Sequence, residues 1–326
     1  MDKKLYAKLF NVTALDALAV VENNTFNDTQ AGTILARHLE HIDPTIFETQ
    51  YPDLAALTAG FEVDNSGGVA STITSLKVDE SGEFRQAGDK DSNKGKITLH
   101  GAESQIPVFE YEATSEWSDT QIQRADQQGV NLVNRLLTAH DKIYKRDIDR
   151  VSLIGLEDVP LSRGLLNTTA FTSTAAGDNI EDMTPKQRYE AIADLINDQH
   201  SSVNNIMLYK ANRVIMPVRV RNALNVQYEG ITTPMSVYNV LRQTFPEVEL
   251  IETFRADTLA NGGNLSVSAT LAVSNHGSVG KIRVPEALTI GQIYDKGSFH
   301  HAVDSRYRVA GYDVLESKGG KRLTGL

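Results

Sequence analysis

The sequence predicts an α+β fold for this chain of 326 residues. Three observations support the prediction. Apolar side chains recur every three to four positions across residues 130–151, which is typical of a long amphipathic helix. Helices with amino-terminal capping signals alternate with short apolar strands across residues 184–253. Residues 265–317 have mainly the pattern of strands, so helices and strands share one layered structure without a strict repeat.

The composition is that of an ordinary folded chain and excludes several kinds of chemistry. Apolar residues make up 40% and charged residues 23% of the chain, and 42 acidic side chains outnumber 32 basic ones, for a net charge of −10. This charge argues against a protein whose main task is to grip nucleic acid phosphates. The chain has no cysteine, which excludes disulfides, zinc–thiolate sites, iron–sulfur clusters and thiol catalysis. Stability must come from packing, which a chain of this length can provide.

The amino-terminal part predicts a helix followed by an extended arm. In residues 29–41 apolar side chains follow one helical face, and the pattern stops before Asp43-Pro44, since the residue before a proline avoids the helical region. Residues 42–59 are mixed in character and hold two prolines, so we expect an extended arm there. We find neither a signal peptide nor 18 consecutive apolar residues, and therefore expect no membrane span and synthesis in the cytoplasm.

A long polar hairpin is predicted across residues 66–103. Small polar and β-branched residues alternate over residues 71–78, and the pattern returns over residues 96–99. The centre, residues 79–94, is charged and contains glycines, so the tip cannot bury itself in a core of its own. Loops of this length are usually functional or disordered. Residues 106–117 then alternate apolar and polar side chains, which predicts a half-buried strand.

Two helices follow this strand in the prediction. Ser118-x-x-Gln121 has the form of a capping box and opens a short helix that should end or bend at Gly129. The long helix, of about 22 residues, comes next. Its polar face is expected to be solvated or to face another subunit, with ion pairs along it. This face carries Arg135, Asp141, Lys142, Lys145, Arg146, Asp147 and Asp149.

From about residue 165 a second compositional unit begins. Thr184-Pro185 predicts a capped helix, and Thr233-Pro234 repeats the signal before another one. Pro217 closes a strand and can open a helix through residue 224. The last residues, 319–322, are expected to form a frayed end. Strands are predicted at residues 213–216, 248–253, 269–273 and 281–284, and within residues 300–315.

The motifs of several enzyme classes are missing. The sequence has no G-x-S-x-G nucleophile elbow, since Gly277-Ser278-Val279-Gly280 is one residue short of it and is expected to be a turn. It has no phosphate-binding G-x-x-x-x-G-K-[ST] loop and no dinucleotide-binding G-x-G-x-x-G. We therefore predict no catalytic, no cofactor-binding and no metal-binding residues.

Single polar and aromatic residues have structural interpretations that compete with functional ones. His38 and His41 could hold a metal ion with Asp43, but zinc needs three or four converging ligands and the sequence indicates no others, so two surface histidines are favoured. His140 lies on the apolar face of the long helix, where a hydrogen-bonded core histidine is favoured over a general base. Trp117, the only tryptophan, is interpreted as a packing anchor.

Two further groups lie on predicted strands. His300 and His301, with Asp304, cannot converge on a metal ion, because adjacent side chains of a strand point to opposite faces. Glu110 and Glu112 share one face, where a charged outer surface explains them as well as paired-carboxylate chemistry does.

The two ends of the chain differ in charge. Residues 296–326 hold six basic and three acidic side chains, whereas residues 1–50 hold four basic and seven acidic ones. Scatter along the sequence is one explanation of this difference. Alternatively, an acidic arm of one copy meets a basic surface on another, and charge complementarity sets their register more than their affinity.

The order of these parts resembles the major capsid proteins of tailed phages, the Hong Kong 97 fold. Residues 42–52 (IDPTIFETQYP) look like the leading run of one capsid subfamily. Residues 148–155 and the GLLN at residues 164–167 look like its passage from the spine helix to the axial domain. The resemblance covers most of the chain from about residue 35. It implies an N-terminal arm at 1–54, an extended β-hairpin loop with its base at 55–105, a peripheral domain with the spine helix at 106–164, an axial domain at 165–284, and a return to the peripheral domain at 285–326.

What the resemblance implies is a structural shell protein and not an enzyme. Copies of the chain would form hexamers and pentamers of an icosahedral shell around double-stranded DNA, in contact through the N-terminal arm and the extended loop. The implied partners are portal, scaffolding and decoration proteins, with packaged DNA bound only non-specifically, no membrane, assembly in the host cytoplasm and a final place in the virion. Some relatives cross-link through a lysine of the extended loop, but none of Lys77, Lys90, Lys94 and Lys96 matches that role. The alternatives are an encapsulin-like nanocompartment shell and, more remotely, a soluble α/β enzyme.

Overall fold

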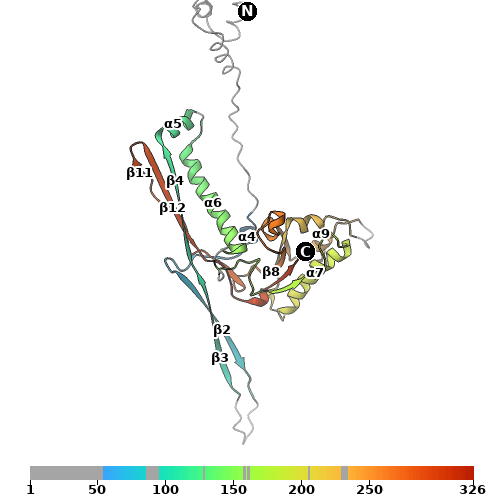
Figure 1. Cartoon of the computed structure of the whole chain (residues 1–326). Helices are drawn as coiled ribbons and strands as arrows, with labels where there is room; N and C mark the ends of the chain where they lie inside the picture. Colours follow the sequence, from blue (N-terminus) through green and yellow to red (C-terminus); the bar gives the residue numbers. More distant parts are fainter. Residues whose placement is uncertain are drawn as a thin grey trace, which may run out of the picture. The chain divides into compact units, whose positions relative to one another are not determined.

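The computed structural model describes residues 54–85, 95–127, 129–156, 159, 162–204, 206–228 and 234–326. The chain divides into two units, residues 1–50 and residues 51–326, and the described residues all belong to the second. The helix predicted at residues 29–41 and the arm as far as residue 53 lie outside the described residues. Figure 1 gives the order of the helices and strands.

A five-stranded mixed sheet has the strand order β5-β14-β8-β6-β7. β6 pairs in parallel with β7 and antiparallel with β8. β14 pairs antiparallel with β8 and in parallel with β5, so strands from distant parts of the sequence are neighbours. The strands are β5 (Thr172–Ala175), β6 (Arg213–Pro217), β7 (Glu249–Thr253), β8 (Ala269–Val273) and β14 (Gly320–Thr324).

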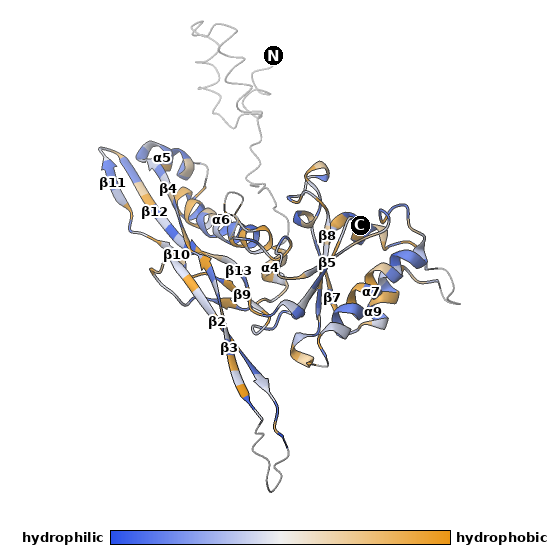
Figure 2. Ribbon diagram, turned by 60° about the horizontal axis from the view of Figure 1, so that its bottom comes forward, coloured by the Kyte–Doolittle hydropathy of each residue, from blue (hydrophilic) through white to orange (hydrophobic). Residues whose placement is uncertain are grey.

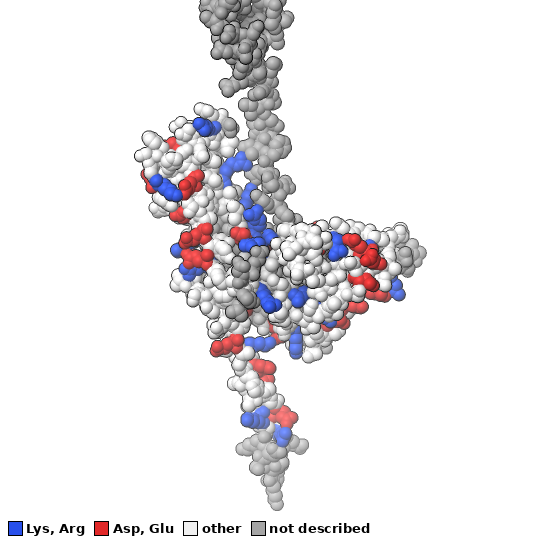
Figure 3. Space-filling view, viewed as in Figure 1, with Lys and Arg blue, Asp and Glu red and all other residues white. Residues whose placement is uncertain are grey.

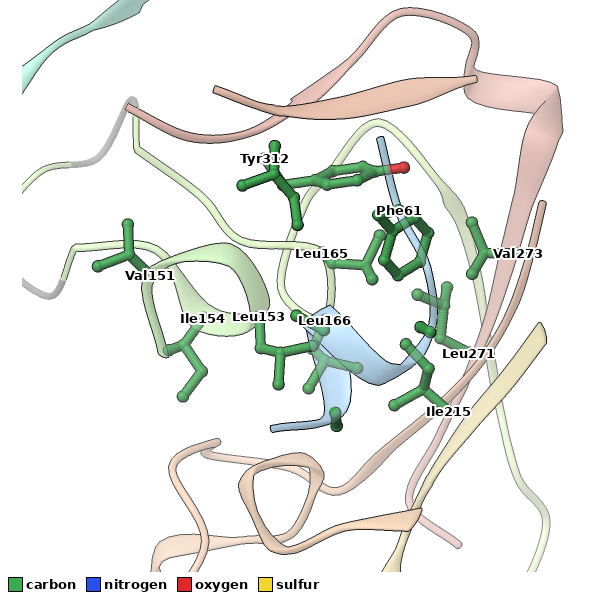
Figure 4. Packing of buried hydrophobic residues seen from close by; sticks show 14 of the residues in the cluster. Phe61, Val151, Leu153, Ile154, Leu165, Leu166, Ile215, Leu271, Val273 and Tyr312 are labelled. Carbon is green, nitrogen blue, oxygen red and sulfur yellow. The ribbon is translucent and has the colours of Figure 1, made fainter. Parts of the chain in front are cut away.

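The inner strands β6 and β8 of this sheet are buried on both faces. On one face, Val214 and Met216 of β6 pack in a cluster with apolar side chains of three helices. On the other face, Ile215 belongs to a second cluster, which Figure 4 shows together with Leu153 from the end of the long helix α6. Alternate residues of one strand therefore serve two cores, as the pleat of a strand requires. The helices are α6 (Leu132–Ile154), α7 (Pro185–Ser202), α8 (Val218–Ala223) and α9 (Val237–Thr244).

A four-stranded sheet packs against α6. β12 pairs with β4 along its whole length, and with β10 and β11 on its other side. Tyr307 of β12 stacks on Tyr111 of β4, with ring centroids 5.3 Å apart, and meets the ring of Tyr144 of α6 edge-on at 5.0 Å. These aromatic contacts join the helix to the sheet. The strands are β4 (Phe109–Ser118), β10 (Glu286–Ile290), β11 (Tyr294–Gly297) and β12 (His300–Val309).

The predicted hairpin is confirmed, and its strands are longer than expected. β2 (Thr72–Gly82) and β3 (Ile97–Pro107) pair antiparallel along eleven residues each. Figure 1 shows this ribbon extending away from the other sheets, and Figure 2 shows apolar residues recurring along it. Its base lies beside a small sheet of β1 (Val63–Asp64), β9 (Gly280–Arg283) and β13 (Gly311–Val314).

The predicted helices are largely confirmed. The predicted capping box opens α5 (Asp119–Gln127). The backbone N–H of Ser118 donates to the side chain of Gln121, and the backbone N–H of Gln121 donates to the hydroxyl of Ser118. Thr184 and Gln187 form the same reciprocal cap on α7. The long helix begins and ends a few residues later than predicted, with the side chain of Asn131 as its cap.

The turn after α6 explains the glycines and the asparagine of the GLLN passage. Gly155 has a φ of +84°, and a Cβ there would lie 2.0 Å from a backbone carbonyl oxygen, so only glycine fits. The side chain of Asn167 accepts a hydrogen bond from Gly164 N at 2.7 Å and donates one to Ile154 O at 2.6 Å. Asn167 therefore caps the end of α6, and the two leucines between are fully buried.

The polar face of α6 is not wholly solvated, contrary to the prediction. Asp149 is 2% exposed; it accepts hydrogen bonds from Ala56 N at 2.8 Å and from Arg255 Nε at 3.1 Å. Burial raises the pKa of Asp149, although the Ala56 amide and the Arg255 charge act against that rise. Nearer the amino end of the helix, Lys145 and Asp141 form the expected exposed ion pair at 2.8 Å.

Residues 55–59 are also not extended as predicted. Ala55–Thr58 form the short helix α4, and both Ala55 and Ala56 are buried in the cluster at the end of α6. Small side chains allow this close approach, and the carboxylate of Asp149 satisfies the amide of Ala56 at the start of the helix.

Three further predictions differ from the structure. α9 begins at Val237 and is capped by Ser236, not by Thr233-Pro234. β10 and β11 were not predicted, because most of their residues are exposed and lack the apolar alternation of a half-buried strand. The expected frayed end contains β14, in which Gly320 is buried, and a Cβ there would lie 2.9 Å from the ring of Phe171. Its glycines reflect close packing and not disorder.

The division into arm, loop, peripheral and axial segments stays a prediction. β14 adds a strand from residues 285–326 to the sheet that residues 172–273 otherwise form. Among the described residues, no helix is both long and apolar enough to cross a membrane.

We expect Arg255→Met to lower the free energy of unfolding by about 3–5 kcal/mol, because it leaves the buried Asp149 carboxylate without its counterion. The loss should shrink as the pH falls, since a protonated Asp149 needs no counterion and its pKa is already raised. Urea unfolding of the unassembled chain at several pH values measures both effects.

Lys145→Met is the matched control, because it breaks an exposed pair on the same helix and should cost less than about 0.5 kcal/mol. Similar small losses for both variants would show that the buried pair does not hold the helix.

Candidate assembly surface

His140 lies in the core, as predicted. It is 7% exposed, and its two ring nitrogens lie 2.6 Å from Ser305 Oγ and 2.7 Å from Ser115 Oγ. The two serines come from the paired strands β12 and β4, so the histidine joins α6 to both strands. Because both ring nitrogens are hydrogen-bonded within the core, the geometry is that of a structural contact.

The other residues singled out in the sequence also have structural surroundings. Glu110 pairs with Arg308 of the neighbouring strand, which supports a charged outer face. His300 is exposed, whereas His301 faces carboxylates on other elements, so the two histidines do not converge. Trp117 is 4% exposed and buried as expected.

No group of three or more His, Asp or Glu side chains is placed to hold a metal ion within the part of the chain that the structure describes. His38, His41 and Asp43 lie outside that part.

The hairpin carries apolar side chains on one face of its ribbon. Leu76 and Val78 of β2 point to the same face, because they are two residues apart. Ile97 and Leu99 of β3 lie on that face as well, since they pair with residues 82 and 80 of β2. The exposed fractions of these four side chains are 67, 56, 58 and 68% in that order. We call Leu76, Val78, Ile97 and Leu99 the apolar stripe; exposed apolar surface of this kind marks an interaction site.

The opposite face of the ribbon is fixed to the body at its base. Ser75 Oγ donates to Asp313 Oδ2 at 2.6 Å and accepts from Arg283 Nη2 at 3.0 Å, while Arg283 also donates to Asp313 Oδ2 at 3.0 Å. Lys77 Nζ donates to Glu316 Oε2 at 2.7 Å. Partial burial acts to raise the pKa of the Glu316 carboxyl. The hydrogen bonds from Lys77 Nζ and from the backbone N–H of Lys318, with the charges of both lysines, outweigh burial, so this pKa lies below its usual value. We call Ser75, Lys77, Arg283, Asp313 and Glu316 the basal clip.

A groove of about 450 Å³ lies beside the basal clip, between the ribbon and the residues that follow β13. Lys77 and Ala102 line it from the body-facing side of the ribbon, and Tyr209, Val314 and Leu315 line it from the body. The base of the ribbon is therefore not closely packed here. Its angle to the body depends on the polar contacts of the clip.

The charges on the ribbon are mixed in sign. Figure 3 shows basic and acidic side chains close together on it, and the described ones beyond the clip include Asp79, Glu80, Glu83, Arg85 and Lys96. A mixed pattern gives no single-sign field that would attract phosphates. The arrangement suits docking on a protein surface, with apolar burial for affinity and local charges for register.

Comparisons with known proteins agree on one kind of molecule. A family profile described as "Major capsid protein" matches residues 87–326. Among solved structures, the chain is similar to the capsid of Myoviridae phage XM1 with 37% sequence identity and a TM-score of 0.77, over 89% of this chain and 98% of that one.

More distant structures share the fold alone. The capsid of a native GTA particle matches with 13% identity and a TM-score of 0.65, over 90% of this chain and 98% of that one. A chain from Mycobacterium phage Ogopogo matches with 13% identity and a TM-score of 0.58, over 90% and 99%. A search of curated proteins found no match.

We expect the double variant Ser75→Ala, Lys77→Ala to loosen the ribbon without unfolding the chain. The contacts it removes are worth about 1–2 kcal/mol together, since they are one hydrogen-bond network and one ion pair whose lysine is half exposed. Hydrogen–deuterium exchange should become severalfold faster at the base of β2 and β3 and stay unchanged in β14.

The matched control is Asp79→Ala, Ser81→Ala, which changes the same face of the ribbon nearer its tip. Equal exchange at the base in both variants would contradict a role for the clip in orienting the hairpin.

Proposed function

The chain belongs to the major capsid protein family, and we propose that it self-assembles through its hairpin into the hexamers and pentamers of a tailed-phage head. Membership of this family makes it a structural subunit of a virion shell. The shell encloses double-stranded DNA. The chain has a structural and not an enzymatic role in this proposal. The similarity to the phage XM1 capsid supports it over most of the chain.

The apolar stripe is the observation that carries the proposal. Fully burying a Val, Leu or Ile side chain is worth about 1.5–3 kcal/mol, so four side chains that are more than half exposed can contribute on the order of 4–8 kcal/mol per hairpin on docking. A two-stranded ribbon has no core that could bury them within the same ribbon. The surface that receives the stripe belongs to a neighbouring copy.

The basal clip complements the stripe. It holds the polar face of the ribbon on its own subunit and leaves the apolar face directed outward. A ribbon with a fixed angle loses less conformational freedom on docking than a free one, which favours association. The same subunit thus supplies both the contact energy and its direction.

The finer parts of the assembly remain proposals. The N-terminal arm, residues 1–54, contributes a second contact between copies; all but its last residue lies outside the described residues. Portal, scaffolding and decoration proteins are the further partners, and assembly takes place in the host cytoplasm. With a net charge of −10 per copy, packaged DNA is bound only non-specifically.

Neither alternative from the sequence has support in these comparisons. The family profile is that of major capsid proteins, and the similar structures from phage XM1 and the GTA particle are capsids.

We expect the stripe variant Leu76→Ser, Val78→Thr, Ile97→Thr, Leu99→Ser to stay folded but to lose assembly. Losing about 4 kcal/mol per contact weakens association about 10³-fold, because each 1.4 kcal/mol is a factor of ten. Sedimentation and electron microscopy should show shells for the native chain and free subunits or capsomers for the variant.

The matched control is Ser81→Val, Thr98→Val, a cross-strand pair on the opposite face of the ribbon. It should assemble like the native chain. Intact shells from the stripe variant would disprove the docking role of the stripe, and a folded native chain that never forms shells would disprove the assembly itself.

A further inference from the structure

The end of the four-stranded sheet holds a histidine between two carboxylates. His301 of β12 lies opposite Asp295 of β11 in the strand register. Its Nδ1 lies 2.7 Å from Asp295 Oδ1, and its Nε2 lies 2.8 Å from Oδ1 of Asp119, the first residue of α5. The imidazole thus joins three elements, α5, β11 and β12. We call His301, Asp119 and Asp295 the tip clamp.

The hydrogen-bonding groups around His301 favour its charged form. An ionised carboxylate only accepts hydrogen bonds, and a neutral imidazole carries a single N–H. Both ring nitrogens face carboxylate oxygens, so both contacts are satisfied only when both nitrogens carry hydrogen, which is the imidazolium form. In agreement, the hydrogen bonds to Asp119 and then to Asp295 raise the pKa of His301 above its usual value.

The neighbouring charged groups have partners of their own. Lys296 of β11 pairs with Glu116 of β4. Asp304 of β12 accepts a hydrogen bond from Thr114 of β4 at 2.6 Å and a further one from Tyr294 of β11. The two carboxylates of the clamp are therefore the charged groups that act directly on His301.

The clamp holds a strained turn. Phe299, between β11 and β12, has a φ of +67°, which is a genuine outlier for a bulky residue and a source of backbone strain. Its carbonyl oxygen accepts a hydrogen bond from Asp119 N at 3.1 Å, so one residue of the clamp also anchors the turn. The Phe299 side chain is 73% exposed, and packing against its own subunit does not explain the strain.

We propose that His301 is a protonation-controlled clamp, which as imidazolium ties α5 and β11 to β12 and on losing its proton releases one carboxylate and loosens the turn that carries Phe299. The sign follows from linkage. A histidine whose folded-state pKa is raised contributes stability that is fully present below its unfolded value of about 6.5 and is lost as the pH rises through the folded value. The clamp is closed in acid and opens toward alkaline pH.

Hydrogen–deuterium exchange of the full chain tests the proposal. Protection of residues 119–127 and 294–302 is measured from about pH 6 to about pH 9 and corrected for intrinsic exchange at each pH. It should fall severalfold across this range, while β14 stays protected and serves as the folded reference.

Three variants separate the clamp from a general effect of pH. In Asp295→Asn the side-chain amide donates to the bare nitrogen of a neutral His301, so the tip should stay protected at every pH. His301→Gln presents an oxygen to one carboxylate and should leave the tip loose at every pH. His300→Gln, one position away and exposed, should behave like the native chain. Native protection that does not change with pH, or an unchanged pH dependence in Asp295→Asn, would overturn the proposal.

Discussion

The buried ion pair between Asp149 and Arg255 is the contact on which the position of the long helix depends. It joins α6 to the residues that follow β7 of the large sheet, and the same carboxylate holds the first helical turn, α4. A buried ion pair contributes little more to the free energy of unfolding than apolar residues of the same size would. Removing one partner, however, leaves an uncompensated buried charge, which is strongly destabilising. The pair therefore selects one position for the helix. With the Asn167 cap, it fixes the carboxyl end of α6 at two points.

Arg283 has a comparable place at the hairpin. Its guanidinium contacts the carboxylates of Asp64 and Asp313 and the hydroxyl of Ser75, which come from β1, β13 and β2. In a chain without cysteine, such multiple hydrogen bonds from one arginine fix the angle between elements that share little apolar area. The two surfaces of the ribbon then have separate tasks. The polar base determines where the ribbon points, and the apolar stripe is the surface that we propose docks on a neighbouring copy.

Local signals in the sequence predicted much of the fold. The hairpin, α5, α6 and α7 follow from side-chain alternation, helical periodicity and capping boxes, all of which act within a few residues. The stripe is readable from the same alternation once the pairing of β2 and β3 is known. The basal clip is not, because Ser75 and Asp313 lie 238 positions apart and no spacing rule connects them. Helical periodicity places Asp149 on the solvated or subunit-facing side of the helix for the same reason, since only the tertiary position of Arg255 shows that it is buried. The glycines at 319 and 320 predict a frayed end, because their close contacts with Val279 and Phe171 are visible only in the fold.

The position of β14 has a consequence for synthesis. This strand lies between β5 and β8, and its partner in β5 was translated about 150 residues earlier. The large sheet therefore cannot close until β14 has been made, and contacts of such long range slow folding. The hairpin leaves the ribosome long before that step, with its stripe exposed. A nascent chain that docked its hairpin at once would join a neighbour before its own sheet was complete, because that sheet closes only after β14 has been made.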